Sequence, residues 1–213
     1  KFTPLEAGEL RNAIIGYVDK VKFTYSNIYI IDGSRRSAHS NAFFTGFGKT
    51  KRIALFDTLM DQLSTDEIVS VIAHEVGHNK KGHILMGMVL SIVHIGIMLF
   101  LLSLMLENRS LFDAFFMEKP SIYASIVFFA LLFTPVDLVI SPILQWISRR
   151  NEYQADDWAI ATIADGENLV SGLKKLAAKN LANLSPHPMF VMLNYSHPPL
   201  LDRIKSMRFQ ITR

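Results

Sequence analysis

Cysteine is absent from the chain's 213 residues, so it forms no disulfide and offers no thiolate to a metal. Any zinc site must therefore be built from imidazole and carboxylate groups. Charged residues are also scarce, at 19%, whereas 50% of the residues are hydrophobic. The net charge is only +3, and no basic run is interleaved with aromatic residues as in a nucleic-acid groove. We therefore expect no nucleic-acid partner.

The chain begins with Lys1 and shows no charged segment followed by a short apolar core and a cleavage site. Its length suits one domain or two small ones, and it is long enough to bury a core. We expect it to be a piece of a longer protein, in which earlier membrane spans would precede Lys1.

An H-E-x-x-H pattern occurs at residues 74–78. On a helix, a spacing of four places His74 and His78 one turn apart on the same face, where both imidazoles can bind one metal ion. Glu75 lies beside them and can take a proton from water that the metal activates. Ser64 and Glu67 form a capping-box pattern that predicts where this helix begins. Chance would produce the pattern in about one of a hundred such sequences; the remaining alternatives are a solvated helix and a non-catalytic zinc site.

The region before this pattern predicts one helix and a small sheet. Residues 3–20 have a cap-like start and apolar positions at helical spacing. Residues 27–32, 41–47 and 52–56 are strand-like and suggest an antiparallel sheet. An exposed edge of that sheet could bind an extended substrate as a further strand, although 41–47 could equally be a core strand.

Two long apolar runs follow the H-E-x-x-H pattern. Residues 84–106 carry no formal charge, and as a helix they would reach roughly 34 Å, enough to cross a bilayer. Residues 121–147 are apolar except for Asp137 and include Pro135 and Pro142. Because the segment between the runs is too short for a domain, we predict a transmembrane hairpin. A buried pair of helices in a soluble protein is the alternative.

Basic residues flank the open end of this predicted hairpin. They are Lys80, Lys81, Arg149 and Arg150. Because basic residues mark the cytoplasmic side of a membrane, the H-E-x-x-H end is predicted to face the cytosol. His94 and Asp137 are costly in lipid, so we expect them to hydrogen-bond between helices or to line an aqueous cavity.

A catalytic zinc needs a third protein ligand, and the predicted hairpin indicates where it lies. Antiparallel spans bring the residues after Ile147 back beside those before Ile84. In that stretch Glu152 and Asp156 are four apart and share a helical face. We assign Glu152 as the third ligand of one Zn²⁺ per chain, and Asp156 as the acceptor that fixes the tautomer of a ligand histidine. The alternative is a pair of exposed carboxylates that cap the helix.

Peptide hydrolysis also needs a donor for the developing oxyanion. His197 and Arg203 are the candidates, with a proline-rich turn and a surface histidine as the alternative. His83 stands five residues after His78, off the ligand face, and is expected to pack or to contact a ligand. Helices are predicted over 150–163, 167–183 and 200–209.

Five segments occur in one order along nearly the whole chain. They are DGSRRSAHSNAFF (32–44), KRIALFDTL (51–59), HEVGHNKKGH (74–83), NEYQAD (151–156) and YSHPPLLDRI (195–204). In this order and form they resemble the type I CAAX prenyl endopeptidases, which are integral-membrane zinc metallopeptidases of the gluzincin group.

The resemblance implies roles for named residues. His74, His78 and Glu152 would bind zinc, Glu75 would be general base and acid, and Asp156 would partner a ligand histidine. His197 and Arg203 would contact the substrate or transition state, and Asn41 would belong to the strand that aligns the substrate backbone. In that family seven spans enclose a water-filled chamber, whereas this chain shows two.

The predicted fold is α+β and mainly α, a gluzincin-like core with an inserted transmembrane helical hairpin. Residues 1–83 and 148–213 would form the catalytic domain, and 84–147 the hairpin. The leading function is a zinc endopeptidase in the lipid bilayer, its site facing the cytosol, that cleaves peptide or protein substrates near the C-terminus of prenylated CAAX-type proteins. The alternatives are a quality-control protease for damaged polypeptides and a non-catalytic zinc-stabilised scaffold.

Overall fold

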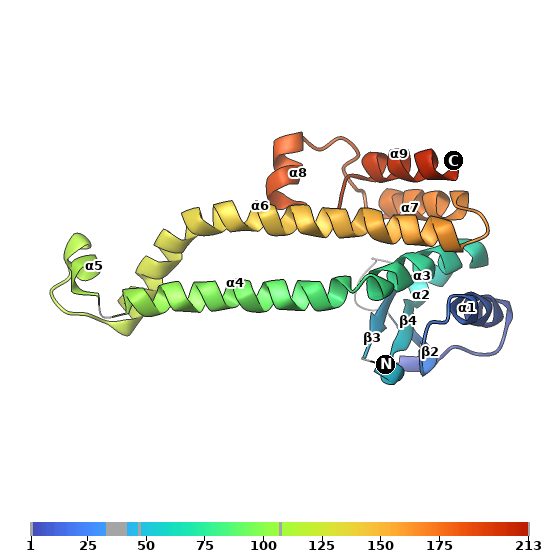
Figure 1. Cartoon of the computed structure of the whole chain (residues 1–213), viewed down its shortest axis with the longest axis horizontal. Coiled ribbons are helices and arrows are strands. Elements are labelled where there is room, and N and C mark those ends of the chain that lie inside the picture. The colour runs from blue at the N-terminus through green and yellow to red at the C-terminus, as the bar shows by residue number, and fades with distance from the viewer. Residues whose placement is uncertain (1, 33–41, 47, 107, 213) are drawn as a thin grey trace.

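The computed structural model describes residues 2–32, 42–46, 48–106 and 108–212. The fold is mainly helical with a small mixed sheet. Two long helices, α4 (His83–Met105) and α6 (Ile122–Thr162), extend together from a body that holds the sheet and most other helices (Figure 1). The short helix α5 (Arg109–Ala114) lies at their far end, where the chain passes from α4 to α6.

The sheet has the strand order β1-β2-β4-β3. Its strands are β1 (Phe2–Pro4), β2 (Asn27–Ile31), β3 (Ala42–Thr45) and β4 (Arg52–Phe56), with a 3-10 turn, η1 (Gly48–Thr50), before β4. The prediction of an antiparallel sheet is wrong for the central pair, because β2 and β4 run parallel. The chain changes direction between β2 and β3 and again between β3 and β4, and β3 occupies the far side of β4. The strands β2 and β4 are therefore left as parallel neighbours.

The first residues also differ from the prediction. Residues 3–20 were expected to be one helix, but Thr3 and Pro4 belong to β1, which pairs antiparallel with β2. The helix α1 (Glu9–Lys20) begins only after Gly8. Proline is tolerated in β1 because this strand is an edge of the sheet, where a missing backbone N–H breaks no ladder.

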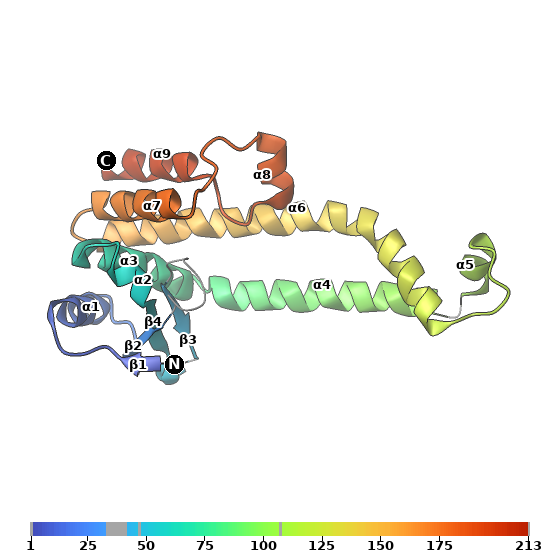
Figure 2. The same ribbon diagram turned by 180° about the vertical axis from the view of Figure 1, so that it is seen from behind.

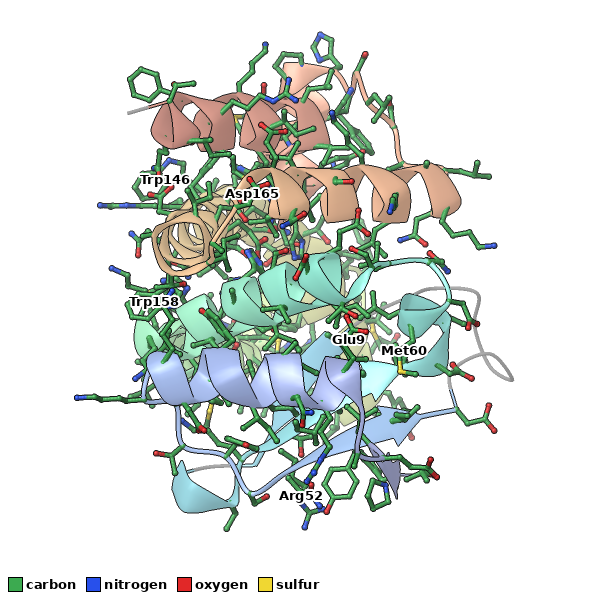
Figure 3. The ribbon with its side chains drawn as sticks, turned by 90° about the vertical axis from the view of Figure 1, so that its right-hand side faces the viewer. Glu9, Arg52, Met60, Trp146, Trp158 and Asp165 are labelled. Carbon is green, nitrogen blue, oxygen red and sulfur yellow. The ribbon has the colours of Figure 1, made fainter. Side chains whose placement is uncertain are left out.

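The helix α3 (Thr65–Lys80) is the centre of the body and follows the short helix α2 (Asp57–Met60). The predicted capping box is confirmed: the Glu67 amide donates to Ser64 Oγ at 3.4 Å, and the Ser64 amide donates to Glu67 Oε2 at 2.8 Å. α3 contacts α1 and β3, and also α6 and α7 (Glu167–Lys179). Viewed along the long axis, α3 lies between α1 and α6, with Trp158 at the junction with α6 (Figure 3).

The helix α6 joins two predicted elements into one of 41 residues. The apolar run 121–147 and the helix predicted at 150–163 are continuous, because residues 143–162 contain neither proline nor glycine to end the helix. Pro135 and Pro142 lie inside its apolar half, which is bent (Figure 2). After α7, the short helix α8 (Pro188–Asn194) and α9 (Leu200–Ile211) complete the chain.

The helices α4 and α6 are both long and apolar enough to cross a membrane, with mean hydropathies of 2.5 and 2.2 in their most apolar windows. None of that window is buried in α4, and 11% of it is buried in α6. Leu85, Ile92 and Val139, for example, are 67%, 66% and 66% exposed. The alternative of a buried helical pair therefore does not describe these two helices.

Candidate active site

The two histidines of the H-E-x-x-H pattern lie one turn apart on α3 and face the same point. Their Nε2 atoms are 3.1 Å apart, and the ring centroids are 4.7 Å apart. His74 is buried and His78 is half-buried. The spacing of four residues thus gives the shared direction expected on a helix.

The helix α6 brings Glu152 to these two imidazoles. Its carboxylate oxygens lie 3.5 Å from His74 Nε2 and 3.3 Å from His78 Nε2. One ligand atom from each of the three residues lies within 4.8 Å of the others. Among the described residues, Glu152 Oε2 is a buried oxygen that accepts no hydrogen bond. Burying an oxygen without a hydrogen bond is costly, so two imidazoles and this carboxylate are a donor set that fits a metal ion.

A glycine lets α3 and α6 approach closely enough for this meeting. A Cβ added to Gly77 would lie 3.0 Å from the Ala155 carbonyl oxygen and 3.1 Å from Trp158 Cβ. Ala155 stands between Glu152 and Asp156 in the sequence, on the same turn of α6. The packing of Gly77 against Ala155 therefore sets how near the α6 carboxylates come to the α3 histidines.

Asp156 contacts His74, a candidate metal ligand, and Arg203 in turn holds Asp156. Asp156 Oδ1 lies 2.8 Å from His74 Nδ1. A carboxylate acceptor there keeps a proton on Nδ1, and the other ring nitrogen, Nε2, faces Glu152. Arg203, from α9, donates to both Asp156 oxygens, from Nε at 2.8 Å and Nη2 at 2.7 Å. Its Nη1 is 3.4 Å from Glu152 Oε2. All four side chains are buried, so the guanidinium partly neutralises both acids of α6.

These buried charges shift the pKa values in opposite directions. Burial alone would lower the pKa of His74, but its contacts with Asp156 and Glu152 outweigh burial and raise that pKa to about 9. Burial disfavours ionised Glu152 and Asp156, yet the histidine and Arg203 contacts hold both pKa values below their usual range. Burial raises the pKa of Glu75. Of the three acids, Glu75 is thus the one that accepts a proton most readily.

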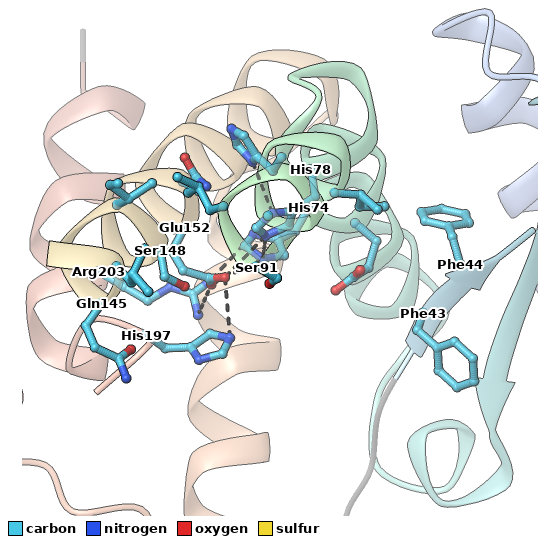
Figure 4. A pocket seen from close by; sticks show the side chains of 18 of the residues that line it. Phe43, Phe44, His74, His78, Ser91, Gln145, Ser148, Glu152, His197 and Arg203 are labelled. Carbon is cyan, nitrogen blue, oxygen red and sulfur yellow. Dashed lines mark hydrogen bonds and ion pairs between the residues drawn. The ribbon is translucent and has the colours of Figure 1, made fainter. Parts of the chain in front are cut away.

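A cavity of about 920 Å³ opens beside His74, His78 and Glu152. Glu75 lines it. Phe43 and Phe44 of the edge strand β3 line it as well (Figure 4). Asn41, which was expected to align a substrate from this strand, lies outside the described residues. The cavity extends between the two long helices, where His94 and Asp137 also line it with their side chains 3.2 Å apart. These two residues thus contact each other between helices and line the cavity as well.

His197, in the segment before α9, lies beside Glu152. Its Nε2 lies 3.4 Å from Glu152 Oε1, and its side chain is 65% exposed (Figure 4). Its Nδ1 lies 2.9 Å from Ser196 Oγ, so both ring nitrogens have protein partners although the side chain lines the cavity and is exposed. Arg203 also lines the cavity but is occupied by Asp156.

His83 contacts His78, a candidate metal ligand, and such a contact was one of the two roles expected for it. Its Nδ1 lies 3.1 Å from His78 Nδ1, and its Nε2 lies 3.1 Å from Gln154 Oε1 on α6. The sequence did not single out Gln154. The sequence signal that could have indicated this contact was Gly82, which lies between α3 and α4 and has a positive φ of 74°. The chain turns at Gly82, so counting along one continuous helix misplaces His83.

The chain is similar to known proteins in sequence and in fold. The chain is 39% identical to CAAX prenyl protease 1 of Saccharomyces cerevisiae over 98% of this chain and 49% of the relative. It is 32% identical to the human CAAX prenyl protease 1 homolog, over 98% of this chain and 52% of the relative. The crystal structure of S. mikatae Ste24p matches with a TM-score of 0.88 and 38% identity, over 97% of this chain and 52% of that one. The chain thus spans about half the length of these relatives.

The family expected from the five sequence segments is confirmed by these relatives. Residues 4–210 match the profile of one peptidase family and include every described residue of the site. The chain belongs to peptidase family M48.

Proposed function

We propose that this chain forms the zinc-binding part of a membrane endopeptidase that cleaves near the C-terminus of prenylated, CAAX-type proteins. The observation that carries the proposal is the convergence of His74, His78 and Glu152 from two helices beside a large cavity. The similarity to CAAX prenyl protease 1 over nearly the whole chain supports the substrate class.

One Zn²⁺ would be held by His74, His78 and Glu152, with Asp156 orienting His74. Zinc bound there supplies a Lewis acid that polarises the scissile carbonyl group and makes water more acidic. Glu152 supplies the single negative charge among the three ligands, so the centre keeps the positive charge that this chemistry needs.

Glu75 moves the protons of the reaction. It takes a proton from the attacking water and later passes it to the leaving amine. Its pKa, raised by burial, suits both steps, because a carboxyl group with a very low pKa would be a weak base. The cavity that Glu75 lines gives the substrate access to it.

His197 is the donor that we assign to the developing oxyanion. Its exposed imidazole lines the cavity, next to the ligand Glu152. Arg203 adds positive charge near the same point, but two of its nitrogens bind Asp156, so it mainly holds that carboxylate in place. An extended substrate would add to β3, which is an edge of the sheet among the described strands. Asn41, which precedes β3 in the sequence, would align its backbone.

The bilayer would surround α4 and the apolar half of α6. In this proposal residues 1–83 and 148–213 form a gluzincin-like catalytic domain around the transmembrane hairpin 84–147. The site then faces the cytosol, because the basic residues of the hairpin stand at the end that carries it. They are Lys80, Lys81, Arg149 and Arg150.

The Glu75→Gln variant tests the mechanism. It should bind zinc as tightly as the unaltered chain and lose about 100- to 10,000-fold in hydrolysis of a farnesylated CAAX peptide. Chelation should abolish hydrolysis by the unaltered chain, and added zinc should restore it. Full activity of Glu75→Gln, purified free of other proteases, would contradict the role of this carboxylate.

A matched unprenylated peptide tests the substrate class. Preference for the farnesylated peptide supports the proposal. Equal cleavage of both peptides would instead favour a protease that removes damaged polypeptides. Zinc binding without cleavage of either peptide would leave a zinc-stabilised scaffold.

A further inference from the structure

The two ligand histidines differ in what faces their second ring nitrogen. His74 Nδ1 faces the carboxylate of Asp156 at 2.8 Å. His78 Nδ1 faces another imidazole, that of His83, at 3.1 Å between the two Nδ1 atoms. A neutral imidazole has one donor and one acceptor nitrogen, so His83 can either give or take the proton between these rings.

Gln154 decides which way that hydrogen bond runs. Its side-chain oxygen lies 3.1 Å from His83 Nε2, and an amide oxygen can only accept. His83 Nε2 must therefore carry the proton, which leaves the lone pair of neutral His83 on Nδ1. His78 then has to donate from its own Nδ1, and its lone pair lies on Nε2.

The lone pair on His78 Nε2 is on the side of the ring that faces His74 and Glu152, the other two proposed metal ligands. His78 Nε2 is 3.1 Å from His74 Nε2 and 3.3 Å from Glu152 Oε1. An imidazole can bind a metal only through an unprotonated nitrogen. The direction imposed by Gln154 is thus the one that makes His78 a ligand.

We propose that His83 and Gln154 are positioning residues that hold His78 in its metal-binding tautomer through a relay of two hydrogen bonds. The proposal rests on the metal centre proposed above and adds two side chains to it. Neither touches the substrate in this role. Because Gln154 lies on α6 and His83 at the start of α4, the relay also ties both long helices to the centre.

The local surroundings favour this role over packing. His83 is 7% exposed, and both of its ring nitrogens have partners. A hydrophobic side chain of similar volume would fill the same space but offer His78 no acceptor. Substitution by leucine therefore separates packing from hydrogen bonding.

The first test measures zinc affinity by competition with a chromophoric chelator, using the full chain in detergent. His83→Leu should bind zinc about 10- to 100-fold more weakly, the usual effect of losing a partner of a ligand histidine. His83→Asn, whose Oδ1 can replace Nδ1 as acceptor, should recover most of the loss. His187→Leu is the matched control, because His187 caps α8 and should leave the affinity unchanged. Equal affinity of His83→Leu and the unaltered chain would overturn the proposal.

The second test reads the tautomer of His78 directly. Nitrogen and carbon NMR shifts of labelled histidine in the metal-free protein should show the proton on Nδ1 in the unaltered chain and in His83→Asn. In His83→Leu the proton should move toward Nε2. A proton on Nε2 in the unaltered chain, or no change in His83→Leu, would refute the relay.

Gln154 gives an independent pair of variants. Gln154→Leu removes the acceptor, and Gln154→Glu keeps one. The first should weaken zinc binding several-fold and the second should not; the same affinity in both would contradict the assigned direction. Zinc affinity and tautomer report the relay even if the zinc-loaded chain cleaves no peptide, so failure of the proposed peptidase activity is distinguishable from failure of the relay.

Discussion

The two halves of α6 belong to one helix but have opposite surroundings. In the half that carries the site, Glu152, Ala155, Asp156 and Ala159 are all buried against the body. In the apolar half, Leu138 and Val139 are 61% and 66% exposed, and the acid Asp137 is 44% exposed at its side chain. The half at the site thus buries the acids Glu152 and Asp156, whereas the apolar half exposes much of its hydrocarbon, the reverse of a helix in a water-soluble protein.

This contrast shows that the two halves are stabilised differently. The buried half depends on specific contacts among charged groups, each of which leaves a costly unpaired partner if broken. The apolar half has few such contacts and would gain its stability from an apolar solvent around it. Paired substitutions in the two halves should therefore have very unequal effects.

The largest effect is expected from removing an acid from the buried half. Glu152→Ala should lower zinc affinity by more than the roughly 10- to 100-fold cost of losing an outer partner, because a ligand itself is lost. Asp137→Ala, the corresponding change in the apolar half, should leave zinc affinity unchanged. Both affinities can be measured by chelator competition; equal losses would refute the assignment of Glu152 as a ligand.

A smaller effect is expected from adding one methyl group to a glycine. Gly77→Ala places a Cβ against the Ala155 backbone and should destabilise the chain by about 1–3 kcal/mol. It should also weaken zinc binding, since it moves Glu152 away from the histidines. Gly96→Ala on α4 is the control, because its Cβ would meet nothing within 4 Å. Denaturation in detergent should show that Gly96→Ala changes the free energy of unfolding by less than about 1 kcal/mol. An equally small change for Gly77→Ala would contradict the close-packing argument.

The smallest effect concerns Glu67, which joins α3 to α7. Burial opposes its ionisation, but hydrogen bonds from Lys175, Ser171 and the Ser64 amide outweigh burial and hold its pKa below its usual range. Glu67→Gln should cost about 1–2 kcal/mol near neutral pH. The control Glu167→Gln breaks an exposed pair with Arg208 and should cost less than about 1 kcal/mol.

Acid should remove the difference between Glu67→Gln and the unaltered chain. The pKa of Glu67 is lower in the folded than in the unfolded state, so its stabilisation is complete above the unfolded pKa and is lost as the pH falls through the folded one. Unfolding free energies of both proteins, measured from about pH 7 down to about pH 3, should converge. A constant difference over that range would show that the charge of Glu67 contributes nothing.

The sequence predicted those parts of the site that depend on local spacing. His74 with His78, and Glu152 with Asp156, are pairs four residues apart, and the helix turns each pair toward one side. The predicted hairpin then brought the two pairs together, because antiparallel helices return the chain to its starting point. The roles of these residues in catalysis stay predictions.

The remaining features depend on contacts between distant residues. The parallel pairing of β2 with β4 follows from where β3 docks, which no local pattern specifies. Arg149 and Arg150 suggested the end of a span, yet charges alone do not stop a helix, and α6 continues through them. The contact of His83 with Gln154 requires the turn at Gly82 and the position of α6 together.

The unbroken course of α6 has a mechanical consequence. After Pro142, α6 contains neither proline nor glycine up to Thr162, so this stretch rotates about its axis as one unit. Such a rotation turns the Glu152 carboxylate through the same angle. Successive residues are about 100° apart around a helix, and a rotation by even part of that step would aim the carboxylate away from both imidazoles. The rotation of α6 about its axis therefore determines whether Glu152 meets His74 and His78, the three residues that could hold a metal ion.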